Sequence, residues 1–310
     1  MPQEKPHTAY MLTVVAAVEL GFVALSEAAN RAAQNTPQLS EAGAWRLLGN
    51  QEKWVAIERL VTSEGEVAEA RQSLRAALDD AIDFALLPSE GRRKDLLISD
   101  MDSTIIEQEC LDELAHYAGL KDEIAAITAR AMAGELDFEA ALTERVSKLA
   151  GLSLDMLEAC YRERITLMPG AQTMVATMTA HKAHALLVSG GFTYFTSRVA
   201  QAAGFDDHQG NTLIDDGEHL TGAVGMPILG RAAKREALIA AASKSGVSLS
   251  QSLAMGDGAN DLAMIEAAGL GLAVHAKPIV AEAADAAINA TDLTSVLYYQ
   301  GYTDSEIVWR

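Results

Sequence analysis

The sequence has little cysteine and no apolar run long enough to cross a membrane. Its two cysteines, Cys110 and Cys160, stand far apart and lack the paired spacing of zinc ligands or of a disulfide framework, so we expect two buried free thiols. The most apolar N-terminal stretch, residues 10–25, is interrupted by Glu19 and is too short to span a bilayer, and no leader-type cleavage site accompanies it. The sequence therefore predicts a cytoplasmic protein without a membrane-spanning segment.

Positive charge is also scarce, because 24 Lys and Arg face 43 Asp and Glu, which gives a formal charge of −19. This balance argues against a nucleic-acid groove, since phosphate-backbone binding draws on clustered basic residues. A small anionic substrate is still compatible if a metal ion and a few placed cations reverse the potential locally. With 310 residues, 49% of them hydrophobic, the chain can bury a full core in two domains or one elaborated domain.

The first 90 residues predict a small α+β domain. The expected elements are a strand over 11–18, a helix over 27–34 capped by Ser26, a hairpin of residues 45–48 and 54–61 flanking Gly49-Asn50, a helix over 66–78 and a strand over 82–87. This βαββαβ order is that of a ferredoxin-like domain. The polar stretch 88–94, with Pro88 and Gly91, is typical of a linker, and we place the domain boundary there, between residues 1–90 and 91–310.

In residues 91–310, short aliphatic strands alternate with alanine-rich helices. The expected strands are 96–99, 185–188, 252–255, 271–274 and 286–288. Such alternation predicts an α/β fold, a Rossmann-like doubly wound parallel sheet with ligands at the carboxyl ends of its strands. Residues 108–168, with apolar positions at helical spacing, predict an inserted helical cap, and residues 211–225 predict a hairpin flap near the same mouth.

Two carboxylates, Asp100 and Asp102, directly follow the first of these strands. A carboxylate at the end of a buried strand is costly unless it binds a metal or has a partner. In phosphoryl transfer, one carboxylate can attack phosphorus while the other protonates the leaving oxygen and later activates water. Taken alone, two carboxylates at this spacing fit a structural or simple metal-binding role equally well.

Three further features lie at or near the same predicted edge. The second strand ends in Ser189-Gly190-Gly191, whose hydroxyl and backbone N–H groups can hold phosphate oxygens. Lys234 lies on a predicted helix and could offset phosphate charge. The third strand ends in a glycine-rich turn, residues 255–261, that contains Asp257, Asn260 and Asp261. Oxygen ligands without His or Cys favour Mg²⁺ over Zn²⁺.

In their order along residues 95–288, the motifs DMDST, SGG, Lys234 and GDGAND resemble the haloacid dehalogenase superfamily. The resemblance implies Asp100 as nucleophile and Asp102 as general acid and base. It also implies Mg²⁺ held by Asp100, the Asp102 backbone carbonyl and Asp257, with Asp261 supporting these ligands. Ser189, Gly190 and Lys234 would bind the transferring phosphoryl group, with Asn260 nearby.

The cap motifs resemble the phosphoserine phosphatase family within that superfamily. They are EQEC around Glu109, MAGELDF from Met132 to Phe138, and LTERV around Arg145. The resemblance implies that Glu109 binds the substrate ammonium and Arg145 its carboxylate, while Met132 and Phe138 exclude water. By residue type alone, these side chains also fit an exposed helix face and the core of a helical bundle. The implied reaction is hydrolysis of O-phospho-L-serine, the last step of serine biosynthesis.

Alternatives remain at the sequence level. A related phosphatase or phosphotransferase acting on another small phosphomonoester would carry the same motifs. The N-terminal element order resembles ACT-type amino-acid-binding domains, and a role in ligand sensing or in homodimer formation is equally compatible with it.

Overall fold

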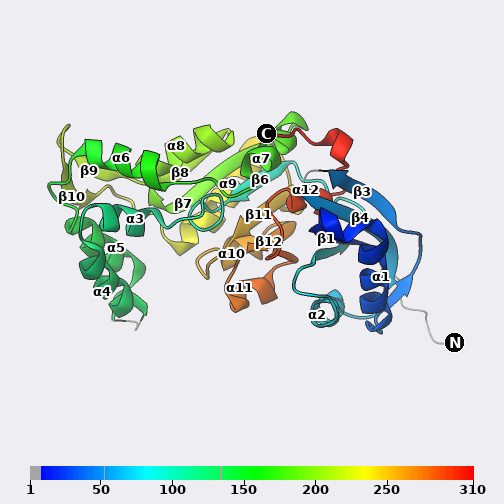
Figure 1. The fold of residues 1–310 in the computed structure, drawn as a ribbon. Coiled ribbons are helices and arrows are strands. Elements are labelled where there is room, and N and C mark those ends of the chain that lie inside the picture. Colours follow the sequence, from blue (N-terminus) through cyan, green and yellow to red (C-terminus); the bar gives the residue numbers. More distant parts are fainter. Residues whose placement is uncertain (1–7, 52, 133–134) are drawn as a thin grey trace.

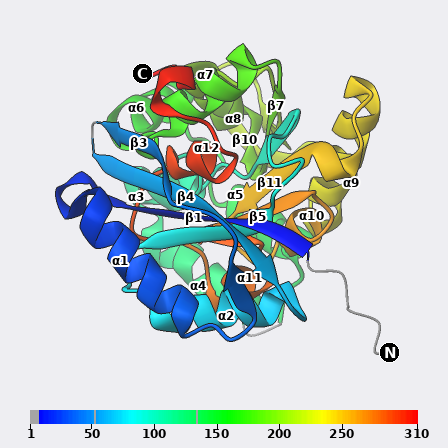
Figure 2. The same cartoon turned by 90° about the vertical axis from the view of Figure 1, so that its right-hand side faces the viewer.

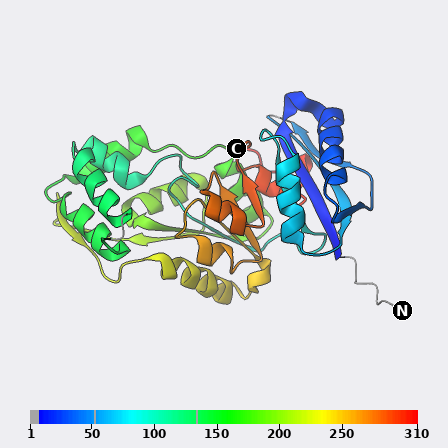
Figure 3. The same ribbon diagram turned by 90° about the horizontal axis from the view of Figure 1, so that it is seen from below.

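The structure is a computed structural model that describes residues 8–51, 53–132 and 135–310. The N-terminal part of the chain and the predicted cap lie at opposite ends of the molecule, with a sheet running between them (Figures 1 and 3). The positions of these parts determine which residues can reach the candidate site.

Residues 8–88 form an antiparallel sheet with two helices on one face (Figure 2). The elements are β1 (Thr8–Ala17), η1 (Val18–Leu20), α1 (Gly21–Gln34), β2 (Leu39–Glu41), β3 (Arg46–Gln51), β4 (Trp54–Ser63), α2 (Val67–Ala77) and β5 (Asp83–Pro88). Strand β1 pairs with β4 and β5, and the outer edge of β4 pairs with β2 and β3. The predicted βαββαβ order is present, with the short β2 added to it.

The prediction that Ser26 caps the first helix is wrong. Helix α1 begins at Gly21, and the Ser26 hydroxyl lies inside it, donating to the Val23 carbonyl at 2.9 Å. The additional turn carries Leu25, which is fully buried beneath the sheet. Tertiary burial therefore extends the helix beyond the point that a local capping signal suggests.

The predicted turn at Gly49-Asn50 is also wrong, although the hairpin itself is present. Both residues belong to β3, and the pairing of Gln51 with Trp54 places the reversal later. A Cβ atom on Gly49 would lie 2.3 Å from Asp304 Oδ1. The glycine thus permits close packing against the C-terminal segment instead of forming a tight turn.

The rest of the sheet consists of parallel strands. These are β6 (Leu96–Ser99), β7 (His184–Phe192), β8 (Asp207–Asn211), β11 (Ser252–Gly256), β12 (Leu270–Val274) and β13 (Ala286–Ile288). Their spatial order is β13-β12-β11-β6-β7-β8, so the strand order reverses between β11 and β6. The five predicted strands are confirmed. The additional strand β8 has the polar sequence DHQGN and carries no hydrophobic strand signal.

Helices cover both faces of these parallel strands. The elements are α7 (Ala171–Ala180), α8 (Thr193–Ala203), α9 (Arg231–Ser245), η2 (Leu249–Gln251), α10 (Leu262–Ile265), α11 (Pro278–Ala283), α12 (Ser295–Tyr299) and η3 (Asp304–Glu306). Ile98 belongs to a buried cluster with Leu238 of α9, whereas its neighbour Leu97 belongs to another with Met174 of α7. Because successive side chains face opposite layers, a strand buried on both sides is apolar throughout.

The predicted cap is helical. It contains α3 (Cys110–Tyr117), α4 (Lys121–Met132), α5 (Phe138–Ser147) and α6 (Leu154–Arg164), and the hairpin of β9 (Leu213–Asp215) and β10 (Leu220–Val224) packs against α5. The two segments that join it to the sheet are paired, since Glu107 N donates to Thr166 O at 3.0 Å and Met168 N donates to Ile105 O at 2.8 Å. The cap is therefore attached through a narrow, hydrogen-bonded neck.

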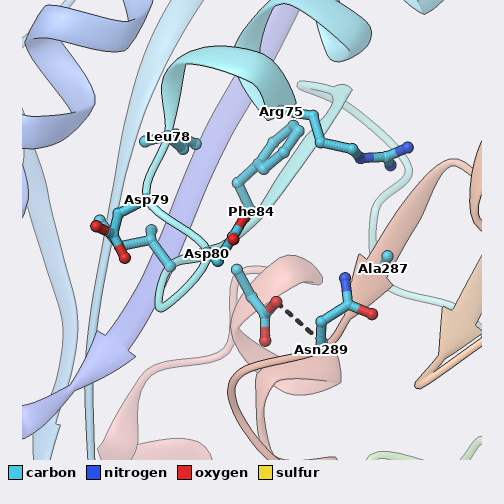
Figure 4. A pocket seen from close by; sticks show the side chains of 9 residues that line it. Arg75, Leu78, Asp79, Asp80, Phe84, Ala287 and Asn289 are labelled. Carbon is cyan, nitrogen blue, oxygen red and sulfur yellow. Dashed lines mark hydrogen bonds between the residues drawn. The ribbon is translucent and has the colours of Figure 1, made fainter.

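The N-terminal sheet continues directly into the parallel strands. Strand β5 pairs antiparallel with β13 through Ala85 and Ala286, which makes one sheet of 11 strands among the described residues. Beside this pairing, the Asp83 carboxylate accepts hydrogen bonds from the N–H groups of residues 289–291 and from the Thr291 hydroxyl, the last at 2.6 Å. A cavity of about 220 Å³ lies at this joint, between the α2–β5 turn and Asn289 (Figure 4).

Both cysteines are free and buried, as predicted. Within the described part of the chain, no helix combines the length and the apolar character needed to cross a bilayer.

Candidate active site

The predicted catalytic residues meet at the carboxyl edge of three adjacent strands. Asp100 follows β6, Ser189 lies near the end of β7, and Asp257 follows β11. Because β11, β6 and β7 are neighbours and parallel, their carboxyl ends share one edge of the sheet. This edge includes the point at which strand order reverses, where doubly wound sheets bind their ligands.

Lys234 joins two of the carboxylates. Its ammonium nitrogen Nζ lies 2.7 Å from Asp100 Oδ1 and 2.6 Å from Asp261 Oδ1. All three side chains are almost completely buried. Burial lowers the pKa of Lys234, but the charges of Asp100 and Asp261 outweigh this and raise it above its ordinary value. The lysine is therefore protonated at any physiological pH.

The carboxylates at this place carry more negative charge than the single ammonium group of Lys234 can balance. Carboxylate oxygens of Asp100, Asp257 and Asp261 all lie within 4.8 Å of one another. Burial, followed by repulsion from Asp100, raises the pKa of both Asp257 and Asp261. A cluster of hard oxygen donors with excess negative charge suits a divalent cation, which would relieve the repulsion. The residues present thus fit a metal ion. Both carboxylate oxygens of Asp261 are engaged, Oδ1 by Lys234 and Oδ2 by the N–H of Gly258 at 3.1 Å, whereas Asp100 accepts from Lys234 and from Met101 N through Oδ1 alone.

Two glycines make the turn after β11 possible. A Cβ atom on Gly256 would lie 2.4 Å from Asp261 Cγ, and one on Gly258 would lie 2.3 Å from Asn260 Oδ1. The side chains of Asp261 and Asn260 therefore fold back directly over the glycine backbone. This packing holds Asp261 beneath Lys234.

Asp102 lies in a different environment from Asp100. Its Oδ2 accepts a hydrogen bond from the Ser189 hydroxyl at 3.0 Å, and its Oδ1 accepts one from Cys110 N at 2.8 Å. Burial and the charge of Asp100 raise its pKa to about 6. The side chain is therefore oriented by two donors and can exchange a proton near neutral pH.

The Phe138 ring of the cap lies over two glycines, Gly190 of β7 and Gly230 at the start of α9. A Cβ atom on Gly190 would lie 3.2 Å from Phe138 Cζ, and one on Gly230 would lie 3.6 Å from Phe138 Cδ1. Its side chain is nevertheless 40% exposed. The structure therefore brings the predicted cap residue to the mouth of the site. The other predicted apolar residue, Met132, ends α4, and its side chain lies outside the described residues.

Two ionisable residues of opposite type, Glu109 and Arg145, are the predicted substrate-binding pair. Glu109 accepts a hydrogen bond from the Ser103 hydroxyl at 2.8 Å, and partial burial followed by the charge of Asp102 raises its pKa to about 7. Arg145 is half-buried on α5, where burial lowers its pKa while Asp112 and Glu109 oppose this change. The two predicted substrate-binding residues thus come from separate helical segments and interact electrostatically at one place.

One residue of the site escaped the sequence analysis. Asn211, at the end of β8, is 1% exposed and hydrogen-bonds to Gly190 and to Leu229. No motif marks it, because its strand is polar and its partners are backbone groups distant in the sequence. A buried amide near a predicted phosphate loop becomes evident only from the fold.

Comparison with known proteins agrees with this geometry. The family model for haloacid dehalogenase-like hydrolases matches residues 97–266, which include Asp100, Ser189, Lys234 and Asp257. The chain belongs to the haloacid dehalogenase-like hydrolase family.

Within this family, its relatives include phosphoserine phosphatases. The phosphoserine phosphatase of Streptomyces coelicolor is 43% identical over 253 residues, which cover 81% of this chain and 61% of the relative. That of Archaeoglobus fulgidus is 40% identical over 250 residues, covering 78% of this chain and 72% of the relative. A solved HAD-family hydrolase from Salmonella enterica superposes with a TM-score of 0.80 at 29% identity, covering 94% of this chain and 98% of that one.

Proposed function

We propose that this protein is a phosphoserine phosphatase that hydrolyses O-phospho-L-serine to L-serine and phosphate. The observation that carries the proposal is the division between its two adjacent carboxylates. Asp100 is held by the protonated Lys234 beside the acidic cluster, whereas Asp102 has a raised pKa and hydrogen-bonds to Ser189. Two carboxylates in contrasting environments suit one nucleophile and one acid–base group. The names of the relatives at 40–43% identity support the choice of substrate.

In the first step, an Asp100 oxygen attacks phosphorus and the bond to the serine oxygen breaks. Asp102 gives its proton to that leaving oxygen, so free serine departs and an aspartyl phosphate remains. Lys234, 2.7 Å from Asp100, offsets the charge of the nucleophile and of the phosphoryl oxygens. Ser189 and the Gly190 backbone would bind those oxygens.

In the second step, water attacks the aspartyl phosphate. The ionised Asp102 takes a proton from this water, which restores its own protonated form and releases phosphate with Asp100 regenerated. The hydrogen bonds from Ser189 and Cys110 keep the carboxylate of Asp102 in place for both transfers.

Mg²⁺ is the proposed metal, and Asp100, Asp257 and the backbone carbonyl of Asp102 would hold it, with Asp261 and Asn260 nearby. When bound, it would neutralise charge on the phosphoryl group and the nucleophile. The all-oxygen composition of the cluster supports this choice over Zn²⁺.

The cap residues would recognise the serine part of the substrate. Glu109 would bind the ammonium group, and Arg145 would present its planar guanidinium to the carboxylate. Phe138, which lies over Gly190, would exclude water together with Met132. A division at residues 1–90 and 91–310, a cytoplasmic location, a homodimer and an ACT-like N-terminal role remain predictions of the sequence.

Substitution of the nucleophile tests the covalent step. Asp100→Asn is expected to lower kcat by about 10⁴-fold or more while the protein stays folded, because the amide cannot attack phosphorus. Turnover of phosphoserine would be compared with that of phosphothreonine, phosphohomoserine and a carboxylate-free ester, with and without Mg²⁺. Substantial activity of Asp100→Asn would refute the covalent mechanism, and equal kcat/KM for all esters would refute the proposed substrate.

A further inference from the structure

Asn211 forms a clamp between the segment Ser189-Gly190-Gly191 and the segment that leads into α9. Its Nδ2 donates to Gly190 O at 2.8 Å and to Leu229 O at 3.3 Å, and its Oδ1 accepts from Leu229 N at 2.7 Å. We propose that Asn211 is a positioning residue that fixes the Gly190–Gly191 peptide relative to Lys234. The inference rests on the phosphatase function proposed above and concerns how the phosphate-binding groups are held.

The first half of the clamp sets the orientation of one peptide unit. In a planar trans peptide, the C=O of Gly190 and the N–H of Gly191 point in opposite directions, so holding one directs the other. The Gly191 N–H donates to Ser189 Oγ at 2.8 Å, and this hydroxyl in turn donates to Asp102 Oδ2 at 3.0 Å. A continuous chain of hydrogen bonds therefore leads from the Asn211 amide through the phosphate loop to Asp102, and each bond polarises the next.

The second half of the clamp holds the entrance to α9. Leu229 immediately precedes Gly230, the residue that caps α9, and Lys234 lies in the first turns of this helix. The two glycines beside the clamp, Gly190 and Gly230, are also the two over which the Phe138 ring lies. Asn211 thus sets the spacing between Gly190, Lys234 and the two glycines that lie beneath Phe138.

The burial of Asn211 makes these bonds difficult to replace. Loss of the amide would leave Gly190 O and both backbone polar groups of Leu229 without a partner that is itself 1% exposed. The peptide after Gly190 would then be free to rotate, so Ser189 and the loop N–H groups would no longer be preorganised for the phosphoryl oxygens. Preorganised donors act mainly on the transition state, so the loss should appear in kcat.

Two substitutions at Asn211 and one control test this assignment. Asn211→Ala removes all three hydrogen bonds of the clamp. Asn211→Asp keeps an acceptor for Leu229 N, but it has a carboxylate oxygen in place of the amide nitrogen that donates to Gly190 O. Thr196→Val is the control, because Thr196 of the adjacent α8 is equally buried and hydrogen-bonds to His208 Nδ1 at 3.0 Å, with no hydrogen bond to Gly190 or Leu229 among the described residues. All proteins are compared with Mg²⁺ at a temperature well below each thermal midpoint, so that only folded enzyme is measured.

We expect both Asn211 variants to lose at least about tenfold in kcat and in affinity for orthovanadate, while KM for phosphoserine changes by less than about threefold. Thr196→Val should keep kcat and vanadate affinity within about twofold of wild type. Vanadate binding is measured by calorimetry without turnover, so the test is valid whichever phosphomonoester the wild type hydrolyses.

The assignment is overturned if Asn211→Ala loses no more kcat and vanadate affinity than Thr196→Val. Wild-type kcat in Asn211→Asp would also overturn it, because the donor to Gly190 would then be dispensable. Failure of wild type to hydrolyse phosphoserine, with vanadate binding still dependent on Asn211, would count against the proposed substrate and leave the clamp supported.

Discussion

The Glu109 carboxylate reaches solvent at the mouth of the site, yet partial burial and the charge of Asp102 raise its pKa from 4.5 to about 7. At pH values between these two, Glu109 of the substrate-free folded protein keeps a proton that the same residue of the unfolded chain has already released. Its stabilising contribution is therefore fully present below pH 4.5 and is lost as the pH rises through 7. A bound ammonium group would favour the ionised form and reverse the shift.

Glu109→Gln is accordingly expected to stabilise the substrate-free protein at pH 8 and to have little effect on its stability at pH 4.5. The same change should raise KM for phosphoserine roughly 10- to 100-fold, because a charged hydrogen bond to the ammonium is lost. Thermal denaturation at both pH values and steady-state kinetics measure the two effects. An identical stability difference at pH 4.5 and pH 8 would contradict the role assigned to ionisation.

Ser103 supports Glu109 from an unusual backbone position. Its φ of 53° lies in the left-handed region, and its hydroxyl donates to Glu109 at 2.8 Å. Ser103→Ala and Ser103→Gly both remove this bond and should raise KM about three- to tenfold with kcat nearly unchanged. Only the alanine retains the cost of positive φ, so the glycine variant should be the more stable of the two. Unchanged KM in both would show that the hydroxyl does not position Glu109.

At the scale of elements, the turn that follows β11 depends on glycine. Gly256 lies beneath Asp261, and a methyl group there would push the carboxylate away from Lys234. Nearby, the same strand order that aligns β11, β6 and β7 brings Asp257, Asp100 and Ser189 to one edge. A small shift of the turn would therefore disturb both the acidic cluster and Lys234.

Gly256→Ala is expected to destabilise the protein by about 1–3 kcal/mol through overpacking and to lower kcat strongly. The matched control is Gly43→Ala, where a Cβ atom would lie 3.6 Å from Leu60 Cβ, an ordinary contact. Chemical denaturation and kcat at saturating Mg²⁺ measure the outcome. Wild-type kcat in Gly256→Ala would mean that the position of Asp261 is not critical.

At the scale of the whole molecule, the N-terminal sheet is covered on both faces. Helices α1 and α2 pack on one side, while Val15 and Leu48 on the other belong to the same buried cluster as Tyr298 and Tyr299 of α12. Together with the β5–β13 pairing and the Asp83 hydrogen bonds, this arrangement couples the two parts. We expect the chain to unfold in one cooperative transition.

Asp83→Ala tests this coupling, because it removes the acceptor of three backbone N–H groups and the Thr291 hydroxyl. The expected cost is about 3 kcal/mol, or a fall of roughly 5 °C in the single Tm. Asp79→Ala is the control. Asp79 is exposed on the same turn, and its carboxylate accepts a hydrogen bond from Ala81 N alone among the described residues. Calorimetry that instead reveals two transitions, with only one lowered, would refute the coupling.

The sequence by itself determined which polar side chains meet at the candidate site. DMDST follows β6, GDGAND begins at the last residue of β11, and SGG, which was predicted to end its strand, lies in the last four residues of β7. The carboxyl ends of parallel strands share one edge of a sheet. Local patterns therefore sufficed to bring Asp100, Ser189 and Asp257 together. The five aliphatic strands and the helical cap were predictable for the same reason, because hydrophobic periodicity is a local property.

The tertiary structure alone decided which distant groups support these side chains. The polar strand β8, the clamp of Asn211, the Phe138 ring over Gly190 and the β5–β13 joint depend on contacts between segments far apart in the chain. The predicted helix cap at Ser26 and the predicted turn at Gly49 were wrong for this reason, since burial of Leu25 and packing against Asp304 override their local preferences. Such contacts leave no periodic signal in the sequence, because each one is a single contact that forms only when complete helices and strands pack together.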